Sequence, residues 1–384
     1  MSTQILHVIT DIDRGGAENH LLDLVRHQRA RGLAVSVAYL RGNGYWTDGF
    51  AELGAQVHDL GLRFYGDLRP LMKLRRVIGS AAFNLVHAHL PPAELYARLA
   101  LLGMSPRALS MLITKHNEER FCEMLGQRIL GRWVAARAAH VITISDAVKR
   151  FIGGSGLGLD ARKLSRIHYG IDAAKFGEAQ DSDARLLRHE WNIPDDALVI
   201  GFVGRLVEQK DIETLLRGMA RFATDSPKAR LVIIGTGPTE AAMRRLADEL
   251  RISDRIVWAG FRDDIRRVMS SFDIFALTSI YEGFGLVLVE AMASRRAVVA
   301  TRVGAVPEVV GTTGLLITPR SPDELAAAFR QLTDYSLRER LGEAGRKRVL
   351  NEFTLERMWK KTDAVYEQCL HREKTRQVLQ EAVS

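Results

Sequence analysis

At 384 residues the chain is too long for a single ordinary hydrophobic core, so two domains are expected. Hydrophobic residues make up 47% and charged residues 26%, which excludes a disordered or fibrous chain. The two cysteines, Cys122 and Cys369, lie far apart, which favours a reducing compartment and argues against a zinc site. No apolar run reaches the roughly 20 residues that span a bilayer, and the first strand follows MSTQ without a leader. We therefore expect a cytoplasmic protein, or one that rests on the inner face of the cytoplasmic membrane.

Positive charge is concentrated in the first half of the chain. Residues 1–170 hold 22 Lys and Arg against 14 Asp and Glu, whereas the remainder holds 32 of each. The basic residues are not interleaved with the aromatic side chains that stack on bases, so nucleic acid is not expected as a partner. An anionic membrane surface, an acidic acceptor and a merely solubilising surface are the alternatives that explain the excess.

The first half alternates apolar strands with helices. Residues 5–10 are expected to form a strand, 11–16 a polar turn that ends in Gly15-Gly16, and 17–31 a helix. Further strands are predicted at 34–39, 56–60, 85–88, 110–114 and 141–144. This alternation predicts a mostly parallel, doubly wound α/β sheet, in which ligands gather at the C-terminal ends of the strands. Asp11 and Asp13, at the tip of the first strand, are interpreted as loop residues rather than metal ligands.

Several polar side chains fall at the predicted strand ends, among them His87, His89 and His116. His87 and His89 have no carboxylate or cysteine at ligand spacing, so we interpret them as structural residues and predict no metal site. His116, in Thr-Lys-His-Asn after a strand, is the candidate functional histidine, with a structural hydrogen-bonding role as the alternative.

The end of the first half contains three further features. Residues 121–137 are predicted to form an amphipathic helix, and Gly153-Gly154-Ser155-Gly156 a flexible loop. A strand at 164–169 then leads into Gly170-Ile171-Asp172, and the polar segment 173–196 is interpreted as the connection between domains.

The second half restarts with a strand at 198–204, which ends at Gly204 and is followed by Arg205 and Lys210. Fixed cations just beyond a strand end suit a diphosphate, because Arg can bind two oxygens at once and Lys acts as a point charge. A second strand, 231–234, ends in a glycine turn at Gly235, and a third is predicted at 256–261.

The segment 278–308 carries the most specific pattern. It follows a predicted strand at 274–277 and contains the turn Gly283-Phe284-Gly285, after which a helix is predicted at Leu286–Ala293. The free N–H groups of such a helix start make an anion site. Two carboxylates, Glu282 and Glu290, lie seven residues apart around it. Because like charges repel, a carboxylate beside a diphosphate should instead face neutral hydroxyl groups, as sugars carry. The alternative is that Glu282 is a turn residue and Glu290 part of a solvated helix face.

This segment resembles the donor-binding signature of the retaining GT-B glycosyltransferases of family four. Other motifs resemble that family too, namely Gly15-Gly16, Gly170-Ile171-Asp172, Gly204-Arg205 with Lys210, and Gly235, so the resemblance covers most of the chain. Four residues depart from the family pattern: Tyr169 replaces an Asn, Asp211 replaces a Gly, and Arg295-Arg296 replace small residues.

The resemblance implies an α/β protein of GT-B architecture, with two Rossmann-like domains facing a central cleft. Residues 1–172 would bind the acceptor and 173–355 the nucleotide sugar, while a helix at 356–384 would cross back to the first domain. The implied reaction moves a sugar, with retention, from a UDP- or GDP-linked donor to a hydroxyl of a glycan or lipid-linked acceptor in bacterial envelope polysaccharide or glycolipid synthesis. No metal or other cofactor is implied.

The resemblance also implies the roles of single residues. Glu282 would hold sugar hydroxyls, Glu290 the ribose, Arg205 and Lys210 the leaving diphosphate, and His116 would lie against the reacting sugar. The implied donor contacts are Gly15, Gly16, Gly204, Arg205, Lys210, Gly235, Glu282, Gly283, Phe284, Gly285, Leu286 and Glu290. Two alternatives stay open: a sugar-nucleotide epimerase or hydrolase on the same fold, and a non-catalytic nucleotide-sugar-binding partner of a larger assembly.

Overall fold

The computed structural model describes residues 3–104, 109–118, 125–177 and 181–381, and the side chains of these residues except 125, 181 and 371–381. The chain divides into two compact units. The N-terminal unit comprises the chain up to Gly170 together with the chain from Leu355 onward, and the C-terminal unit runs from Ile171 to Thr354. The long last helix, α16 (Leu355–Glu381), therefore belongs to the N-terminal unit.

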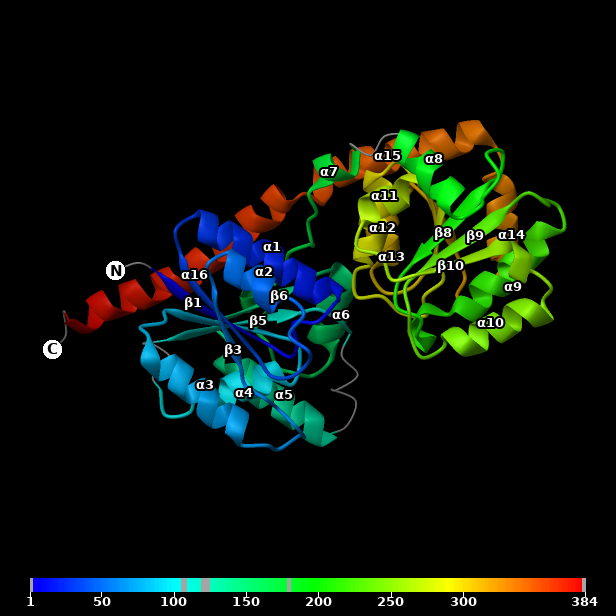
Figure 1. The fold of residues 1–384 in the computed structure, drawn as a ribbon. Coiled ribbons are helices and arrows are strands. Elements are labelled where there is room, and N and C mark those ends of the chain that lie inside the picture. Colours follow the sequence, from blue (N-terminus) through cyan, green and yellow to red (C-terminus); the bar gives the residue numbers. More distant parts are fainter. Residues whose placement is uncertain (1–2, 105–108, 119–124, 178–180, 382–384) are drawn as a thin grey trace. The chain divides into compact units, whose positions relative to one another are not determined.

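The N-terminal unit is built on a seven-stranded sheet whose strands all run parallel, in the order β3-β2-β1-β4-β5-β6-β7 (Figure 1). The strands are β1 (Gln4–Ile9), β2 (Ala34–Tyr39), β3 (Gln56–Asp59), β4 (Leu85–His89), β5 (Ser110–Lys115), β6 (His140–Thr143) and β7 (Leu164–Arg166). The prediction of a parallel, doubly wound sheet is confirmed. The order reverses between β1 and β4, so the C-terminal ends of these two strands form a switch point at which ligands commonly bind.

Helices cover both faces of this sheet (Figure 1). They are α1 (Gly16–Ala30), α2 (Thr47–Glu52), α3 (Arg69–Ser80), α4 (Ala93–Ala100), α5 (Leu125–Arg137) and α6 (Asp146–Gly154). One core cluster joins Ile5, Leu85 and Leu112 of the sheet to Met358 and Tyr366 of α16. The C-terminal helix thus supplies part of the hydrophobic core of the N-terminal unit.

The C-terminal unit repeats the architecture with a six-stranded parallel sheet in the order β10-β9-β8-β11-β12-β13. The strands are β8 (Val199–Val203), β9 (Arg230–Ile234), β10 (Ile256–Gly260), β11 (Ile274–Leu277), β12 (Ala297–Thr301) and β13 (Leu315–Ile317). The helices are α7 (Ala173–Gly177), α8 (Asp181–Glu190), α9 (Ile212–Ala223), α10 (Glu240–Glu249), α11 (Ile265–Ser270), α12 (Leu286–Ala293), α13 (Val306–Val310), α14 (Pro322–Gln331) and α15 (Tyr335–Glu352). Here the switch point lies between β8 and β11.

Three sequence-based expectations differ from the structure. Gly153 and Gly154 end α6 rather than form a loop, because Ser145 caps the helix and the buried Ala147, Val148 and Ile152 outweigh the cost of two glycines. The polar segment 173–196 contains α7 and α8 rather than a plain connection. The strand predicted at 164–169 ends at Arg166. The first residues of the helix predicted at 121–137 lie outside the described residues.

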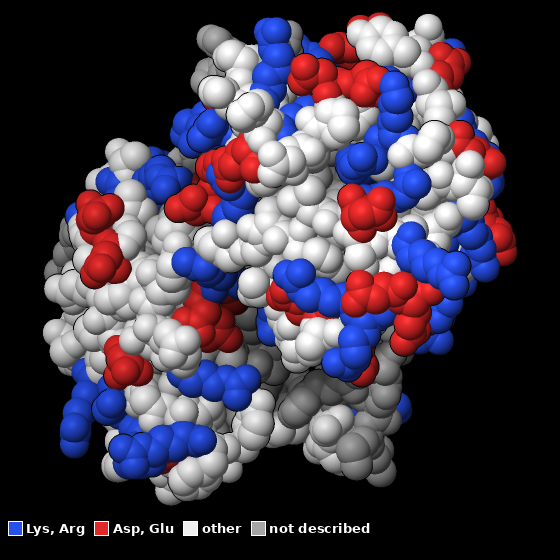
Figure 2. All heavy atoms as spheres, turned by 45° about the vertical axis from the view of Figure 1, so that its right-hand side comes forward, with Lys and Arg blue, Asp and Glu red and all other residues white. Residues whose placement is uncertain are grey.

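The surface carries both signs of charge. On the face drawn in Figure 2, basic and acidic side chains alternate and no wide area of one sign is visible. Every helix in the described part of the chain is too short or too polar to cross a membrane.

Candidate functional site

The candidate site of the C-terminal unit lies at the switch point of its sheet. β8 and β11 are paired neighbours, so the loops that follow them leave the same edge of the sheet side by side. The backbone holds these loops together, since Ile280 N–H donates to the Gln209 carbonyl at 2.8 Å and the Thr278 hydroxyl donates to the Lys210 carbonyl at 3.0 Å. The cations after β8 are therefore brought to the glutamate after β11.

Glu282 forms the centre of this arrangement. Its Oε1 accepts hydrogen bonds from Lys210 Nζ at 2.5 Å and from the Ser279 hydroxyl at 2.7 Å. The side chains of Glu282 and Lys210 are only 8% and 17% exposed, so the ion pair is largely withdrawn from water. Its Oε2 accepts no hydrogen bond from the residues that the structure describes, and this oxygen is available to a ligand.

The two cations differ in their surroundings. Lys210 is held by Glu282, whereas Arg205 is exposed and forms no ion pair with any described residue. Asp211, at the position where the family resemblance implies Gly, adopts the left-handed conformation that Gly favours, with φ of 46°. Its carboxylate caps α9 by accepting from the Thr214 amide and hydroxyl. The departure at Asp211 therefore preserves the turn that positions Lys210.

Helix α12 begins at Leu286 and ends at Ala293, as predicted. Gly285 precedes it with φ of 81°, and a Cβ there would lie 2.9 Å from Leu288 Cδ1. No described side chain caps this helix start, so its first amides can serve an anion. Phe284, by contrast, is buried against Phe353, so only its backbone faces the site.

Two close backbone approaches fix the loops around the site. Gly235 has φ of 126° and a Cβ there would lie 2.0 Å from the Gly204 carbonyl oxygen. Gly304 has φ of 47° and a Cβ there would lie 2.1 Å from the Glu282 carbonyl oxygen. Gly304 escaped the sequence analysis, although glycine in a segment rich in β-branched residues is a visible signal.

The end of α12 is fixed by the two unexpected arginines. Arg295 pairs with Glu343 of α15 at 2.6 Å, and Arg296 donates to the Phe272 carbonyl at 2.7 Å. Glu290, in the second turn of α12, is half-buried. Arg295 and Arg296 thus attach the helix that carries Glu290 to its neighbours.

Two predicted residues of the N-terminal unit, Gly15 and Gly16, follow β1 at the switch point of its sheet. Gly15 and Gly16 open α1, and a Cβ at Gly15 would lie 2.2 Å from Glu18 Oε2. Glu18 is buried, and this burial, with the nearby Asp11 and Asp13, raises the pKa of its carboxyl to about 7. The glycine loop therefore encloses a carboxylate that the sequence analysis did not select.

His116 follows β5 and is only 3% exposed. Its Nε2 lies 3.1 Å from His89 Nδ1, and its Nδ1 bonds the hydroxyl of Tyr169. Both ring nitrogens are thus occupied by protein groups. Burial holds the pKa of the His116 imidazole well below its usual value. Its contact with a reacting sugar stays a prediction.

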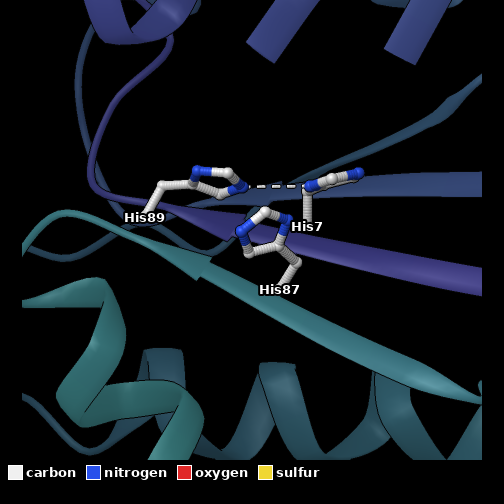
Figure 3. A group of neighbouring side chains, drawn as sticks. All are labelled: His7, His87 and His89. Carbon is white, nitrogen blue, oxygen red and sulfur yellow. Dashed lines mark hydrogen bonds between the residues drawn. The ribbon is translucent and has the colours of Figure 1, made fainter. Parts of the chain in front are cut away.

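Three further imidazoles lie close together in the N-terminal unit (Figure 3). His7, His87 and His89 are fully buried, and their potential ligand atoms all lie within 4.8 Å of one another. The strand register explains this, because His7 of β1 is the direct partner of His87 of β4. The sequence pattern favoured structural roles for His87 and His89 and did not single out His7, which lies 80 residues before His87 on another strand.

The sequence matches two models of one glycosyltransferase family, one for each half of the chain. Residues 14–175 match "Glycosyltransferase Family 4" and residues 183–348 match "Glycosyl transferases group 1". An uncharacterised glycosyltransferase of Methanocaldococcus jannaschii is 31% identical over 60% of this chain and 60% of its own length. The lipopolysaccharide core biosynthesis glycosyltransferase LpsE of Rhizobium meliloti is 33% identical over 44% of this chain and 49% of its own length. These two alignments therefore span less than two thirds of either relative.

The fold is also similar to solved structures. Anabaena HepE, crystallised with UDP and glucose, superposes with a TM-score of 0.83 at 21% identity, covering 95% of this chain and 99% of HepE. At this identity the likeness establishes the two-domain GT-B fold.

Proposed function

This chain belongs to glycosyltransferase family four, the glycosyl transferases group 1, and from this premise we propose that it transfers a sugar from a nucleoside diphosphate sugar to a hydroxyl group, with retention. UDP is the first choice among donors, because the HepE structure contains UDP. The observation that carries the proposal is the buried Lys210–Glu282 pair beside the uncapped start of α12.

The geometry suits departure of a diphosphate. Lys210, Arg205 and the first amides of α12 would bind its oxygens and stabilise the charge that develops as the glycosidic bond breaks. Fixed donors are effective here because they need no reorganisation during the reaction. Glu282 would orient Lys210 through Oε1 and accept a sugar hydroxyl at Oε2, so one carboxylate would serve both substrate halves.

The donor proposal is tested by thermal shift with UDP-, GDP- and ADP-sugars, since a ligand that binds only the folded state raises its stability. We expect UDP-sugars to raise the unfolding temperature most. Arg205→Ala should then cost about 2–4 kcal/mol of transition-state stabilisation in kcat/KM, the scale of one preorganised charge donor. Arg245→Ala, an exposed arginine of α10, is the matched control.

Turnover and binding of the nucleotide sugar, measured with and without acceptor, separate the competing functions. Turnover of the nucleotide sugar without acceptor would indicate an epimerase or hydrolase, and binding without turnover under any condition would indicate a non-catalytic partner. Equal kcat/KM values for Arg205→Ala and Arg245→Ala would remove Arg205 from the mechanism.

We further propose a lipid-linked acceptor, in envelope polysaccharide or glycolipid synthesis, bound by the N-terminal unit. An apolar pocket of about 200 Å³ in this unit is lined by Pro91, Pro92, Leu95, Leu130 and Val134, among others. The relative LpsE, by its name, acts in lipopolysaccharide core synthesis. An apolar pocket suits the hydrocarbon part of such an acceptor.

The same unit carries an edge that suits an anionic membrane surface. Phe64, Leu68 and Met72 are more than half exposed, beside the basic Arg63 and Lys73. Apolar side chains next to cations favour a lipid headgroup region.

We expect the protein to bind anionic vesicles, and this binding should weaken as the salt concentration rises. The double substitution Phe64→Ser with Leu68→Ser should weaken vesicle binding further. Tyr335→Ser, equally exposed in the C-terminal unit, is the control. Absence of vesicle binding at low salt would mean that the charge excess is solubilising only or serves a soluble acidic acceptor.

A further inference from the structure

The buried histidines of the N-terminal unit belong to one continuous hydrogen-bond chain. From His116 it passes to His89 at 3.1 Å, to His7 at 3.0 Å and to the Gln28 side chain at 2.9 Å. Gln28 donates to the Tyr366 hydroxyl at 3.1 Å, which in turn bonds His87 at 2.6 Å. Tyr169 bonds His116, and Thr114 bonds His87 at 2.7 Å. We call these eight residues the imidazole chain.

The amide of Gln28 sets the direction of every bond in the imidazole chain. In the structure its Oε1 faces His7 Nε2, and an amide oxygen only accepts, so His7 carries its proton on Nε2. A neutral ring then accepts at Nδ1, which forces His89 and then His116 into the same tautomer, with Tyr169 donating to His116. On the other side Tyr366 donates to His87 Nδ1 and His87 Nε2 donates to Thr114.

The tautomers of the four rings are therefore linked. If the Gln28 amide were turned around, every bond would reverse together and all four rings would carry the proton on Nδ1. A mixture of tautomers would place two donors or two lone pairs face to face. Burial keeps the rings neutral, because it lowers the pKa of His7 to about 4 and holds those of His87, His89 and His116 well below the usual value.

A metal ion is the competing explanation for three clustered imidazoles (Figure 3). The lone pairs that would bind it are already engaged, since His7, His87 and His89 each use both nitrogens in the imidazole chain. Coordination would break at least one hydrogen bond per ring. It would also place a divalent charge in the core beside three neutral rings, with no carboxylate among them to balance it. The completed hydrogen bonds favour the metal-free arrangement.

We infer that the other members of the imidazole chain, Tyr169 among them, are positioning residues for His116. They hold its ring and the start of the loop after β5 in one orientation, and Tyr366 extends this support to α16. The inference rests on the proposed glycosyl transfer for its consequence, because His116 follows the strand end where the acceptor unit should meet its substrates. Tyr169 stands where the family pattern has an asparagine, so in this protein a phenol bonds His116 at that position. His20, whose Nδ1 has no hydrogen-bond partner in the part of the chain that the structure describes, packs against that phenol with the two ring centroids 4.5 Å apart.

The first experiment observes the rings directly by nitrogen-15 NMR of the full-length protein with labelled histidine. We expect His7, His87, His89 and His116 to be neutral and to share one tautomer at pH 7. A mixed set of tautomers, an imidazolium among the four, or one equivalent of zinc in the purified protein would overturn the inference. This result does not depend on any enzymatic assay, so it stands apart from failure of the proposed function.

The second experiment removes single hydroxyl groups. Tyr169→Phe should shift the His116 nitrogens and lower kcat at least about tenfold with donor KM nearly unchanged, as expected when a reacting geometry loosens. Tyr366→Phe, on the other side of Gln28, should shift the same His116 nitrogens. Tyr96→Phe is the control, because this buried hydroxyl donates to the Asp67 carbonyl at 2.9 Å outside the chain. If Tyr366→Phe leaves His116 unmoved, or Tyr169→Phe matches Tyr96→Phe in kcat, the residues do not position His116.

Discussion

The Lys210–Glu282 pair gives a prediction whose size follows from burial. Glu282→Gln keeps the shape of the side chain and an oxygen for Lys210, but it removes the negative charge. The ammonium of Lys210, 17% exposed, would then remain largely buried without its counter-charge. Breaking a buried pair from one side costs about 3–5 kcal/mol, and the remaining exposure and amide oxygen reduce this, so we expect a loss of about 2–3 kcal/mol in unfolding free energy.

A double-mutant cycle separates this loss from the loss of packing. Lys210→Met alone should also destabilise, because among the described residues it leaves only the Ser279 hydroxyl to bond the Glu282 carboxylate. The double variant should cost less than the sum by about 1–2 kcal/mol, since neither charge is then left alone. The exposed pair Lys228–Asp196, with side chains 69% and 60% exposed, is the matched control and should couple by less than about 1 kcal/mol.

Amide hydrogen exchange in β8 and β11 measures these free energies within the C-terminal unit, which avoids assuming that the whole chain unfolds in one step. If the Lys210–Glu282 coupling is no larger than the Lys228–Asp196 coupling, burial does not strengthen this pair. That result would contradict the proposed role of Glu282 in orienting Lys210 for a diphosphate.

Three other predictions follow from the structure. Glu290→Gln should weaken binding of free UDP, whereas Glu282→Gln should leave it nearly intact and lower kcat; calorimetric titration of both variants decides, and loss confined to the Glu282 variant would reverse the two assignments. Burial lowers the pKa of His7 to about 4 and of His20 to about 3, so as pH falls these histidines are protonated in the unfolded chain before they are protonated in the folded one. The free energy of unfolding should therefore fall as pH drops below about 6.5, by up to about 1.4 kcal/mol per pH unit for each histidine. The raised Glu18 pKa of about 7 acts oppositely, stabilising toward low pH between about 4.5 and 7, so Glu18→Gln should steepen the fall; a melting profile flat from pH 7 to 5 would contradict the buried neutral histidines. Gly304→Ala should destabilise the C-terminal unit by more than about 2 kcal/mol, because its Cβ would lie 2.1 Å from the Glu282 carbonyl oxygen at φ of 47°, whereas Gly126→Ala, which meets no neighbour, should be nearly neutral in thermal unfolding.

Local sequence patterns were sufficient for the layout of both units. Apolar runs of strand length alternate with helical patterns, and only a parallel sheet with helices on both faces buries such runs. The same local logic located α12, since a glycine turn between a buried strand and an apolar segment leaves few other conformations. It failed at Gly153-Gly154 and at 173–196, where modest apolar faces were enough for helices once the rest of the unit was present to cover them.

The candidate sites divide along the same line. The sequence showed that Arg205, Lys210 and Glu282 follow strand ends and that Glu290 lies in the helix after the glycine turn, because strand ends, turns and helix starts are local features. It could not show that Lys210 meets Glu282, 72 residues away, or that Gln28 meets Tyr366, 338 residues away. These contacts depend on the order of strands and on the last helix joining the first sheet, and hydrophobic periodicity is the same for many orders. The sequence by itself thus determined which side chains stand at the sheet edges, and only the tertiary structure decided which of them touch.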